Sequence, residues 1–536
     1  MKMKKNNIFA VFGGLAVVIV LIVVFLMVNP NPGIEREAAN TTGTNGHSSA
    51  AFDAAAGTNG HSPAASDARV GATDDSSAAS DVMTITFVVP DICRIDDDHL
   101  KLFNDELVND GFPYALDIKY IEYEKYAAGI EKELKTGNAD VAFLGLGDAD
   151  GNNNIYSLIN SGSVCKLDEV LASEEGQMLY DAFPEALWEA VKCDHSIYSI
   201  PSALAQDYGS YVAFNRDYIE EDVIESWDGT MEGIYEILKN VEWDDSIAPR
   251  FQYLCGAYSY EDMIGCEIRY GLLFDYDTLT VENPMESEKF TGFLSVMDEM
   301  KREGYLDSSV SYVDNPGLNS SGVRQSIESG NYVVALRSGK IDDGFIRDNI
   351  CVKRVTPYLS SRINGSIGIS KHTEDMNAVV EFLGLFYSNE KYGNLLMYGA
   401  ENEDYKVVDG IAYNMDGTDL YDNYLTKLCL DLFINIYPVK GENFPNNRRE
   451  EYFSYYDSIE LSPFIGFEPD TGNMNNISNE LDAAMTELAG INDSDTTDEK
   501  AEAFEDRISA VSARLKSGGM DAYLDSVRKQ WEEYQK

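Results

Sequence analysis

The feature that most constrains the fold of this chain is an alternation of β-rich runs with amphipathic helical patterns. Three such runs and two helical patterns occupy residues 83–90, 96–109, 118–123, 125–135 and 140–144. Parallel strands need a crossover connection, so strands separated by helices predict βαβ units and a parallel sheet. The sequence therefore predicts an α/β fold. Ligands of such sheets lie beyond the carboxyl ends of the strands, here residues 91–93 and 145–148.

An apolar segment of membrane-spanning length stands at the N-terminus. Residues 8–28 form an uncharged run of 21 residues, which spans about 31 Å as a helix, enough to cross the hydrocarbon layer. Lys2, Lys4 and Lys5 precede this run and are expected to stay in the cytoplasm. We therefore expect residues 1–28 to form a cytoplasmic stub and an uncleaved, single-pass anchor in the cell membrane, with the rest of the chain extracellular. A cleaved signal peptide is the alternative, although its apolar region usually has about 7–15 residues.

Residues 29–81 have the composition of a spacer. Ala, Ser, Gly, Thr, Asn and Asp dominate them, and the hexapeptide GTNGHS at residues 43–48 recurs at residues 57–62. Such a composition buries too little apolar surface to order itself. We predict a disordered linker that holds the following domain on the order of 40 Å from the membrane.

The charge of the chain excludes one large class of partner. Lys and Arg total 41 against 92 Asp and Glu, which gives a net charge of −51. A surface of this sign repels phosphate backbones, so nucleic acid is not an expected partner. Anionic lipids and polyanions are repelled for the same reason, and a neutral or cationic ligand fits better.

Signatures of enzymes and of metal sites are missing from the sequence. It has no G-x-S-x-G, H-E-x-x-H or G-x-x-x-x-G-K-[ST] motif. Residues 148–155 resemble a calcium loop, but Asn153 and Ile159 occupy the places where an EF-hand needs Gly and Glu. None of the seven cysteines has zinc spacing, although Cys255 and Cys266 could form a disulfide. We expect no catalytic residue, no metal and no cofactor.

Short motifs follow one another in a fixed order along the rest of the chain. They read TGNADVAF at residues 136–143, KLD at 166–168, WEAVKCDHSIYSIP at 188–201, YVAFNRD at 211–217, MDEMKREGYL at 297–306, SIESGNYVVAL at 326–336 and GSIGISK at 365–371. In this order they resemble the extracellular solute-binding proteins of ABC importers, sugar-type family 1. The third motif departs from the family pattern, because His195 and Ser196 stand where the family has glycine.

Motifs of the last third narrow this resemblance. They read LMYGAENEDYKVVDG at residues 396–410, PFIGFEPD at 463–470 and KSGGMDAYLDSVRKQW at 516–531. They are similar to the LipO-type lipoprotein subgroup of Gram-positive bacteria. The lipobox cysteine of that subgroup is missing here, since the first cysteine is Cys93. This departure puts a lipid anchor in doubt but not an exported location.

The resemblance implies a two-lobed periplasmic-binding-protein-like fold with a central cleft. Lobe one would hold residues 82–205 and 363–400, and lobe two residues 206–362. Residues 401–536 would form a helical C-terminal extension that packs over both lobes.

Aromatic residues are the positive indication of a ligand class. The chain has 33 tyrosines, and Tyr and Trp offer a flat apolar ring with a polar tip, which suits the C–H faces and hydroxyls of a sugar. Candidate ligand-binding residues lie on predicted loops at strand ends or lobe crossings: Asp148, Tyr156, Gln206, Asp207, Tyr208, Trp227, Tyr253, Arg337, Arg362 and Asn364. Tyr258 is a further tyrosine of this kind, and Tyr208 is the residue we expect to stack on a sugar face.

Together these features predict a membrane-tethered substrate-binding protein of an ABC importer. It would capture a solute, expected to be an oligosaccharide, by closing its two lobes. Its partners would be that solute, the ABC permease subunits and the membrane, reached through the N-terminal helix. It would not be an enzyme. The alternatives are a tethered sensor or adhesin with the same fold and a surface glycoside hydrolase, since 92 carboxylates always allow an acid/base pair.

Overall fold

The structure is a computed structural model of the whole chain. It describes residues 82–144, 155–202, 210–242, 250–254, 259–306, 332–338, 348–355, 358–359, 367–421, 423–440, 448–471, 475–489 and 499–536. Among these residues, none of the helices combines the length and the apolar character needed to cross a bilayer. The predicted anchor and linker, residues 1–81, lie outside the described part of the chain.

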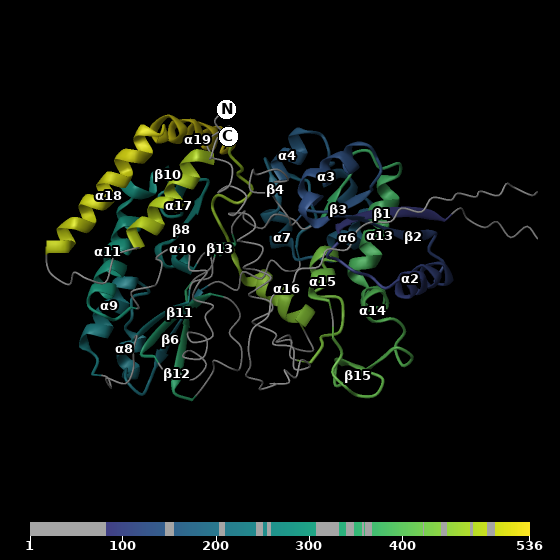
Figure 1. The fold of residues 1–536 in the computed structure, drawn as a ribbon, viewed down its shortest axis with the longest axis horizontal. Coiled ribbons are helices and arrows are strands. Elements are labelled where there is room, and N and C mark those ends of the chain that lie inside the picture. Colours follow the sequence, from purple (N-terminus) through teal and green to yellow (C-terminus); the bar gives the residue numbers. More distant parts are fainter. Residues whose placement is uncertain are drawn as a thin grey trace, which may run out of the picture.

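Two large hydrophobic cores divide the described residues into two lobes, which Figure 1 shows beside each other. The first core is built by β1 (Met83–Pro90), α2 (Asp97–Asn109), β2 (Tyr114–Ile121), α3 (Tyr123–Lys135), β3 (Val141–Phe143), α4 (Ile155–Asn160), α5 (Asp168–Leu171), α6 (Glu174–Tyr180), α7 (Glu185–Ala190), β4 (Lys192–Cys193), β5 (Ser196–Ile197), β14 (Ile367–Ile369), α13 (Met376–Ser388), α14 (Glu390–Tyr398), β15 (Tyr405–Val408), β16 (Ile411–Asn414), α15 (Tyr424–Leu430) and α16 (Arg448–Ser458).

The second core is built by another set of elements. They are β6 (Ser210–Asn215), α8 (Glu221–Glu225), α9 (Met231–Asn240), β7 (Phe251–Leu254), α10 (Ser259–Ile264), β8 (Cys266–Arg269), β9 (Leu272–Asp275), β10 (Thr280–Glu282), the 3-10 helix η1 (Pro284–Glu286), α11 (Glu288–Arg302), β11 (Val334–Ser338), β12 (Ile350–Arg354), α17 (Asn475–Ala489), α18 (Glu499–Ser517) and α19 (Met520–Tyr534). Two short strands, β13 (Tyr358–Leu359) and β17 (Glu460–Leu461), lie between the lobes.

The sheet of lobe one has the order β14-β3-β1-β2. β1 pairs in parallel with β2 along all of its residues and with β3 on its other side, whereas β14 runs antiparallel to β3. The predicted parallel βαβ arrangement is therefore confirmed. α2 begins where the Asp96 carboxylate accepts the backbone N–H of Asp98 at 2.8 Å, and its buried residues Phe103 and Leu107 face the core.

One strand boundary differs from the prediction. β2 begins at Tyr114 rather than at residue 118, and it ends at Ile121. Pairing with β1 extends back to the carbonyl of Pro113, which accepts the N–H of Met83 at 2.8 Å. The exposed Asp117 lies in the middle of β2 and interrupts its run of apolar residues. For this reason the first half of the strand was not predicted from the sequence.

The sheet of lobe two has the order β12-β6-β11-β7, and only β11 and β7 run parallel. Val212, Phe214 and Leu336 of this sheet face the second core. Tyr211 and Ala335 belong to a small cluster on the other face, with Tyr332 and Ile350.

The C-terminal extension is shared between the lobes. Residues from Tyr405 to Tyr456 pack into the first core, whereas residues from Phe464 to Trp531 pack into the second. α17, α18 and α19, the yellow helices of Figure 1, lie over lobe two, where the Trp531 indole donates to the carbonyl of Leu279 at 3.0 Å. Each lobe is thus completed by a different part of the extension.

Candidate functional site

Within the described residues, the chain passes from one core to the other at three places. Ile200 belongs to the first core and Val212 to the second, Val355 to the second and Leu359 to the first, and Tyr456 to the first and Phe464 to the second. We call these passages the first, second and third crossings. Lobes that close about a ligand bend at such connections, and ligands preferentially bind between domains. The crossings are therefore the candidate site.

Hydrogen bonds bring the three crossings side by side. β13 of the second crossing pairs in parallel with β17 of the third, and the N–H of Ser462 donates to the carbonyl of Leu359 at 2.8 Å. At the start of the first crossing, the N–H of Ile200 donates to the carbonyl of Ile367 at 2.8 Å, in strand β14 of lobe one, which follows the second crossing in the chain. The second and third crossings are thus paired with each other, and the first begins beside β14, which follows the second crossing in the chain.

Six of the predicted ligand-binding residues lie outside the described part of the chain. They are Asp148, Gln206, Asp207, Tyr208, Arg362 and Asn364. Gln206, Asp207 and Tyr208 fall within the first crossing, between the described residues 202 and 210, whereas Arg362 and Asn364 follow the second crossing, between the described residues 359 and 367. Their role as ligand-binding residues stays a prediction.

Three further candidates have a described backbone. Tyr253 and Arg337 lie at the ends of β7 and β11, which pair in parallel with Leu336 opposite Tyr253 and Arg337 opposite Leu254. Their carboxyl ends are therefore neighbours, as the crevice of an α/β sheet requires. Tyr156 is the second residue of α4, which follows β3 in the chain.

Trp227 is the one candidate whose side chain is described. It is half-buried in lobe two, with its ring centroid 5.2 Å from that of Phe214. Its indole N–H donates to the carbonyl of Thr230 at 2.9 Å. The indole N–H, the polar group that a sugar hydroxyl would contact, is thus already hydrogen-bonded within lobe two. A contact between Trp227 and a ligand would therefore use the face of the ring.

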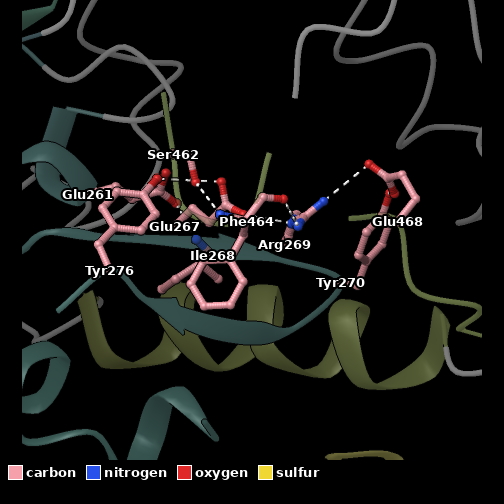
Figure 2. Close-up of polar contacts among 9 residues, drawn as sticks. All are labelled: Glu261, Glu267, Ile268, Arg269, Tyr270, Tyr276, Ser462, Phe464 and Glu468. Atoms are coloured by element: carbon pink, nitrogen blue, oxygen red, sulfur yellow. Dashed lines mark hydrogen bonds and ion pairs between the residues drawn. The ribbon is translucent and has the colours of Figure 1, made fainter. Parts of the chain in front are cut away.

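A buried ionic network, which the sequence analysis did not single out, holds the third crossing to lobe two (Figure 2). Arg269, the last residue of β8, places its Nε 2.8 Å from Glu267 and its Nη1 3.1 Å from Glu468. The hydroxyl of Tyr270 donates to Glu468 at 2.5 Å. Burial raises the pKa of Glu468, whereas the charge of Arg269 opposes this rise. With both carboxylates paired, the network suits anchoring rather than acid/base chemistry.

Aromatic rings connect the same network to the second crossing. Tyr276 donates to Glu267 at 3.4 Å, and its ring centroid lies 4.8 Å from that of Tyr358 in β13. Phe464 of the third crossing packs against Phe274 at 5.2 Å. Phe464 and Glu468 both belong to the motif at residues 463–470, which is the signal that could have identified this region.

A tight hairpin of lobe one also contacts the chain at the end of the third crossing. Asp194 and His195, which join β4 to β5, both have a positive φ, 47° and 64°. A left-handed backbone of this kind is one that glycine adopts most easily. The N–H of Asp194 donates to the carbonyl of Gly466 at 3.2 Å, and the His195 ring stacks on Tyr534 at 4.1 Å. Gly466 has φ 76°, and a Cβ there would lie only 2.8 Å from the Tyr534 hydroxyl.

Helix α16 places aromatic side chains between the first and third crossings. Tyr452 is buried and donates to the carbonyl of Ser202 at 3.3 Å, while Phe453 and Tyr455 are half-buried. Burial lowers the pKa of Arg449, whose guanidinium lies 5.0 Å from the centre of the Phe453 ring. These residues are not among the candidates predicted from the sequence, although the run YFSYY at residues 452–456 is an aromatic signal beside a crossing. Their rings could meet the apolar face of a sugar.

Within the described residues, no group of three or more His, Cys, Asp or Glu side chains is arranged to hold a metal ion. The candidate calcium loop at residues 148–155 falls mostly outside them, since only Ile155 is described. The arrangement around the crossings therefore offers aromatic faces, hydrogen-bonding groups and paired charges.

No protein-family model matches the chain. A relative from Streptococcus pneumoniae serotype 4, a carbohydrate ABC transporter substrate-binding protein, is 23% identical over 474 residues, which are 82% of this chain and 88% of the relative. The crystal structure of the N-glycan transport solute binding protein NgtS from S. pneumoniae superposes with a TM-score of 0.54 at 19% identity, covering 84% of this chain and 98% of NgtS. This likeness shows that the chain has the two-lobed, periplasmic-binding-protein-like fold.

Proposed function

We propose that this chain is the substrate-binding protein of an ABC importer and that it captures a carbohydrate. The observation that carries the proposal is the two-lobed architecture with its three adjacent crossings, the arrangement that hinge closure needs. The carbohydrate class rests on the pneumococcal relative, which aligns with 82% of this chain. The aromatic residues of α16 and of the crossings support it, because ring faces suit sugar rings.

Binding in this scheme is a shift between open and closed lobes. The ligand stabilises the closed form by touching both lobes at once, and the closed lobes then present one surface to the permease subunits. No step of covalent chemistry is assigned to the chain, and ATP hydrolysis takes place on other subunits. The net charge of −51 favours an uncharged ligand such as an oligosaccharide over an anionic one.

The proposal includes tethering at the outer face of the cell membrane, on the pattern of the LipO-type proteins of Gram-positive bacteria. Residues 8–28 would serve as an uncleaved anchor and residues 29–81 as the spacer. N-terminal peptide mass spectrometry of the membrane fraction tests this part. A mature protein that begins after Ala38 or Ala39 would show cleavage instead.

A glycan screen on the full-length chain tests the main proposal. We expect a neutral oligosaccharide to raise the unfolding temperature, because a ligand bound only to the native state stabilises it by mass action. Scattering with this ligand should then show a smaller radius of gyration. Thermal stabilisation without compaction would favour a sensor or adhesin whose lobes do not close, and steady release of reducing ends would favour the hydrolase. Failure of all neutral glycans in the screen would overturn the ligand class.

A further inference from the structure

Two buried cysteines from distant parts of the sequence lie together in lobe one. Cys93 follows the end of β1, and Cys429 lies in the last turn of α15, more than three hundred positions later. Neither side chain has any exposed surface. Both belong to the first core, and β1 packs against α15.

Neighbouring residues fix the alignment of the two thiols. The Thr426 hydroxyl accepts the backbone N–H of Arg94 at 3.0 Å and donates to the Arg94 carbonyl at 2.8 Å. Positions three apart share one face of a helix, so this double contact sets Cys429 against Cys93. The Cys429 thiol donates a hydrogen bond to the Cys93 sulfur, and this bond, together with burial, raises the pKa of Cys429 well above its ordinary value.

Another buried cysteine of this core lacks this arrangement. The sulfur of Cys165 lies 3.8 Å from the thioether sulfur of Met376, which cannot be oxidised to a disulfide with it. Cys165 therefore offers a matched comparison with the Cys93–Cys429 pair. It is a buried thiol whose described sulfur neighbour is a thioether rather than a second thiol.

We propose that Cys93 and Cys429 form a disulfide bond when the chain folds in an oxidising compartment. Each thiol loses one hydrogen, the S–S bond forms, and the oxidant, a small-molecule disulfide or a disulfide-carrying oxidoreductase, is reduced to two thiols. Because both sulfur atoms are buried in the finished fold, the exchange takes place while lobe one assembles. The proposal shares the exported location with the proposed function and is independent of carbohydrate binding.

The bond would join the two sequence ends of lobe one. It would close a very long loop of chain and so restrict the unfolded ensemble, which stabilises the native state. It would also lock the C-terminal extension to the carboxyl edge of β1, where ligands of parallel sheets bind. Lobe one would then move as one body during closure.

Refolding under controlled redox conditions tests the proposal. The full-length chain in detergent is unfolded with reductant and refolded either with reduced glutathione or with a mixture of reduced and oxidised glutathione. It is then denatured, alkylated, digested and mapped by mass spectrometry. We expect the Cys93 and Cys429 peptides to be linked only in the sample refolded with oxidised glutathione, and this sample to unfold at a higher denaturant concentration.

Matched variants separate the bond from other effects. Cys429→Ser should lose both the linked peptide and the oxidant-dependent gain in stability, whereas Cys165→Ser should keep both. If Cys429→Ser does not fold, Cys93→Ala and the peptide map of the unaltered chain decide. Recovery of Cys93 and Cys429 as alkylated thiols from natively folded, oxidised protein, or linked to other cysteines, would overturn the proposal. The same map reports on the Cys255–Cys266 pair suggested by the sequence.

Discussion

The two lobes hold the third crossing in very different ways. Lobe two grips it through buried charges, with Arg269 paired to Glu468 and Phe464 packed among aromatic rings. Lobe one contacts it through the pairing of β17 with β13, through the half-buried Ile465, and through an exposed turn, where Asp194 donates one backbone hydrogen bond and His195 stacks on Tyr534 of α19.

This contrast indicates which parts move together. Paired charges in a buried site resist separation, because an unpaired buried charge is costly. Beyond β17, the exposed hydrogen bond of Asp194 and the ring stack of His195 can be exchanged for water at little cost. We therefore expect the chain from Phe464 onward to move with lobe two, and bending to occur before it, in and around β17.

Removing Arg269 should have the largest effect on this contrast. Arg269→Ala leaves the carboxylates of Glu267 and Glu468 buried without their cation, since these side chains are only 1% and 12% exposed. We expect a loss of about 3–5 kcal/mol in the free energy of unfolding, measured by denaturant titration.

Arg514 provides the matched control for this variant. It also pairs with two carboxylates, Glu480 and Glu487, each at 2.8 Å, but its side chain is 42% exposed. Arg514→Ala should cost no more than about 1 kcal/mol. Equal losses of stability in the two variants would show that burial does not make the Arg269 ion pairs stronger than exposed ones.

A variant of Tyr208 tests the first crossing, which takes no part in the contacts of the third crossing with the two lobes. We predict that Tyr208→Ala weakens sugar binding roughly tenfold or more, since the lost stacking is worth about 1–3 kcal/mol and 1.4 kcal/mol is a factor of ten. Calorimetry with the glycan found in the screen measures the affinity, and denaturant titration measures the stability.

The neighbouring tyrosine of β6 is the control. Tyr211 is buried, so Tyr211→Ala should lower the stability by about 3–5 kcal/mol. If Tyr208→Ala behaves in the same way and binds the glycan with unchanged affinity, Tyr208 belongs to the core and the site assignment is wrong.

His195 probes the weaker grip of lobe one. His195→Asn keeps a residue that tolerates the left-handed backbone and removes only the stack on Tyr534, so we expect a loss of about 0.5–1.5 kcal/mol. His195→Ala should lose about 1 kcal/mol more of stability, because a positive φ is sterically unfavourable for alanine. Losses comparable to that of Arg269→Ala would contradict the picture of a shallow contact.

The smallest effect is a pH dependence at Glu468. Burial raises its pKa in the folded state, so the native state binds this proton more tightly than the unfolded state does. The contribution of Glu468 to stability is therefore full below the unfolded value of 4.5 and is lost as the pH rises through the folded pKa. Relative to Glu468→Gln, the unaltered protein should lose stability over this range.

Charged neighbours and a control complete this test. The charge of Arg269 opposes the rise of the Glu468 pKa, while the charges of Glu267 and Asp194 add to it. The Glu468→Gln variant therefore keeps Arg269, Glu267 and Asp194 unchanged. Glu460→Gln, at an exposed position of β17, should show no such trend. If the unaltered protein instead gains stability over Glu468→Gln as the pH rises, the direction assigned to the Glu468 pKa shift is wrong.

The sequence predicted the features that depend on local patterns. The alternation over residues 83–144 predicts β1, β2 and β3 with their intervening helices, because periodicity and short crossovers suffice to define them. The departure at His195 marked a backbone position that normally needs glycine, and the structure shows a left-handed turn there.

What the sequence did not show depends on contacts between distant positions. Arg269 and Glu468 lie about two hundred positions apart, and Thr426 meets Arg94 across an even longer interval. No periodicity links such positions. The sequence also did not show which part of the C-terminal extension packs on which lobe. The helices that pack on either core have the same spacing of apolar residues.

That division has a consequence for how the chain is made. Trp531, close to the last residue, lies in the core of lobe two, and Tyr456 lies in that of lobe one. Domains whose residues are contiguous can fold one after another as they leave the ribosome. Here the core of the first lobe needs residues as far as Tyr456, and the core of the second needs residues as far as Trp531. Neither lobe can therefore complete its core during synthesis before these residues have left the ribosome.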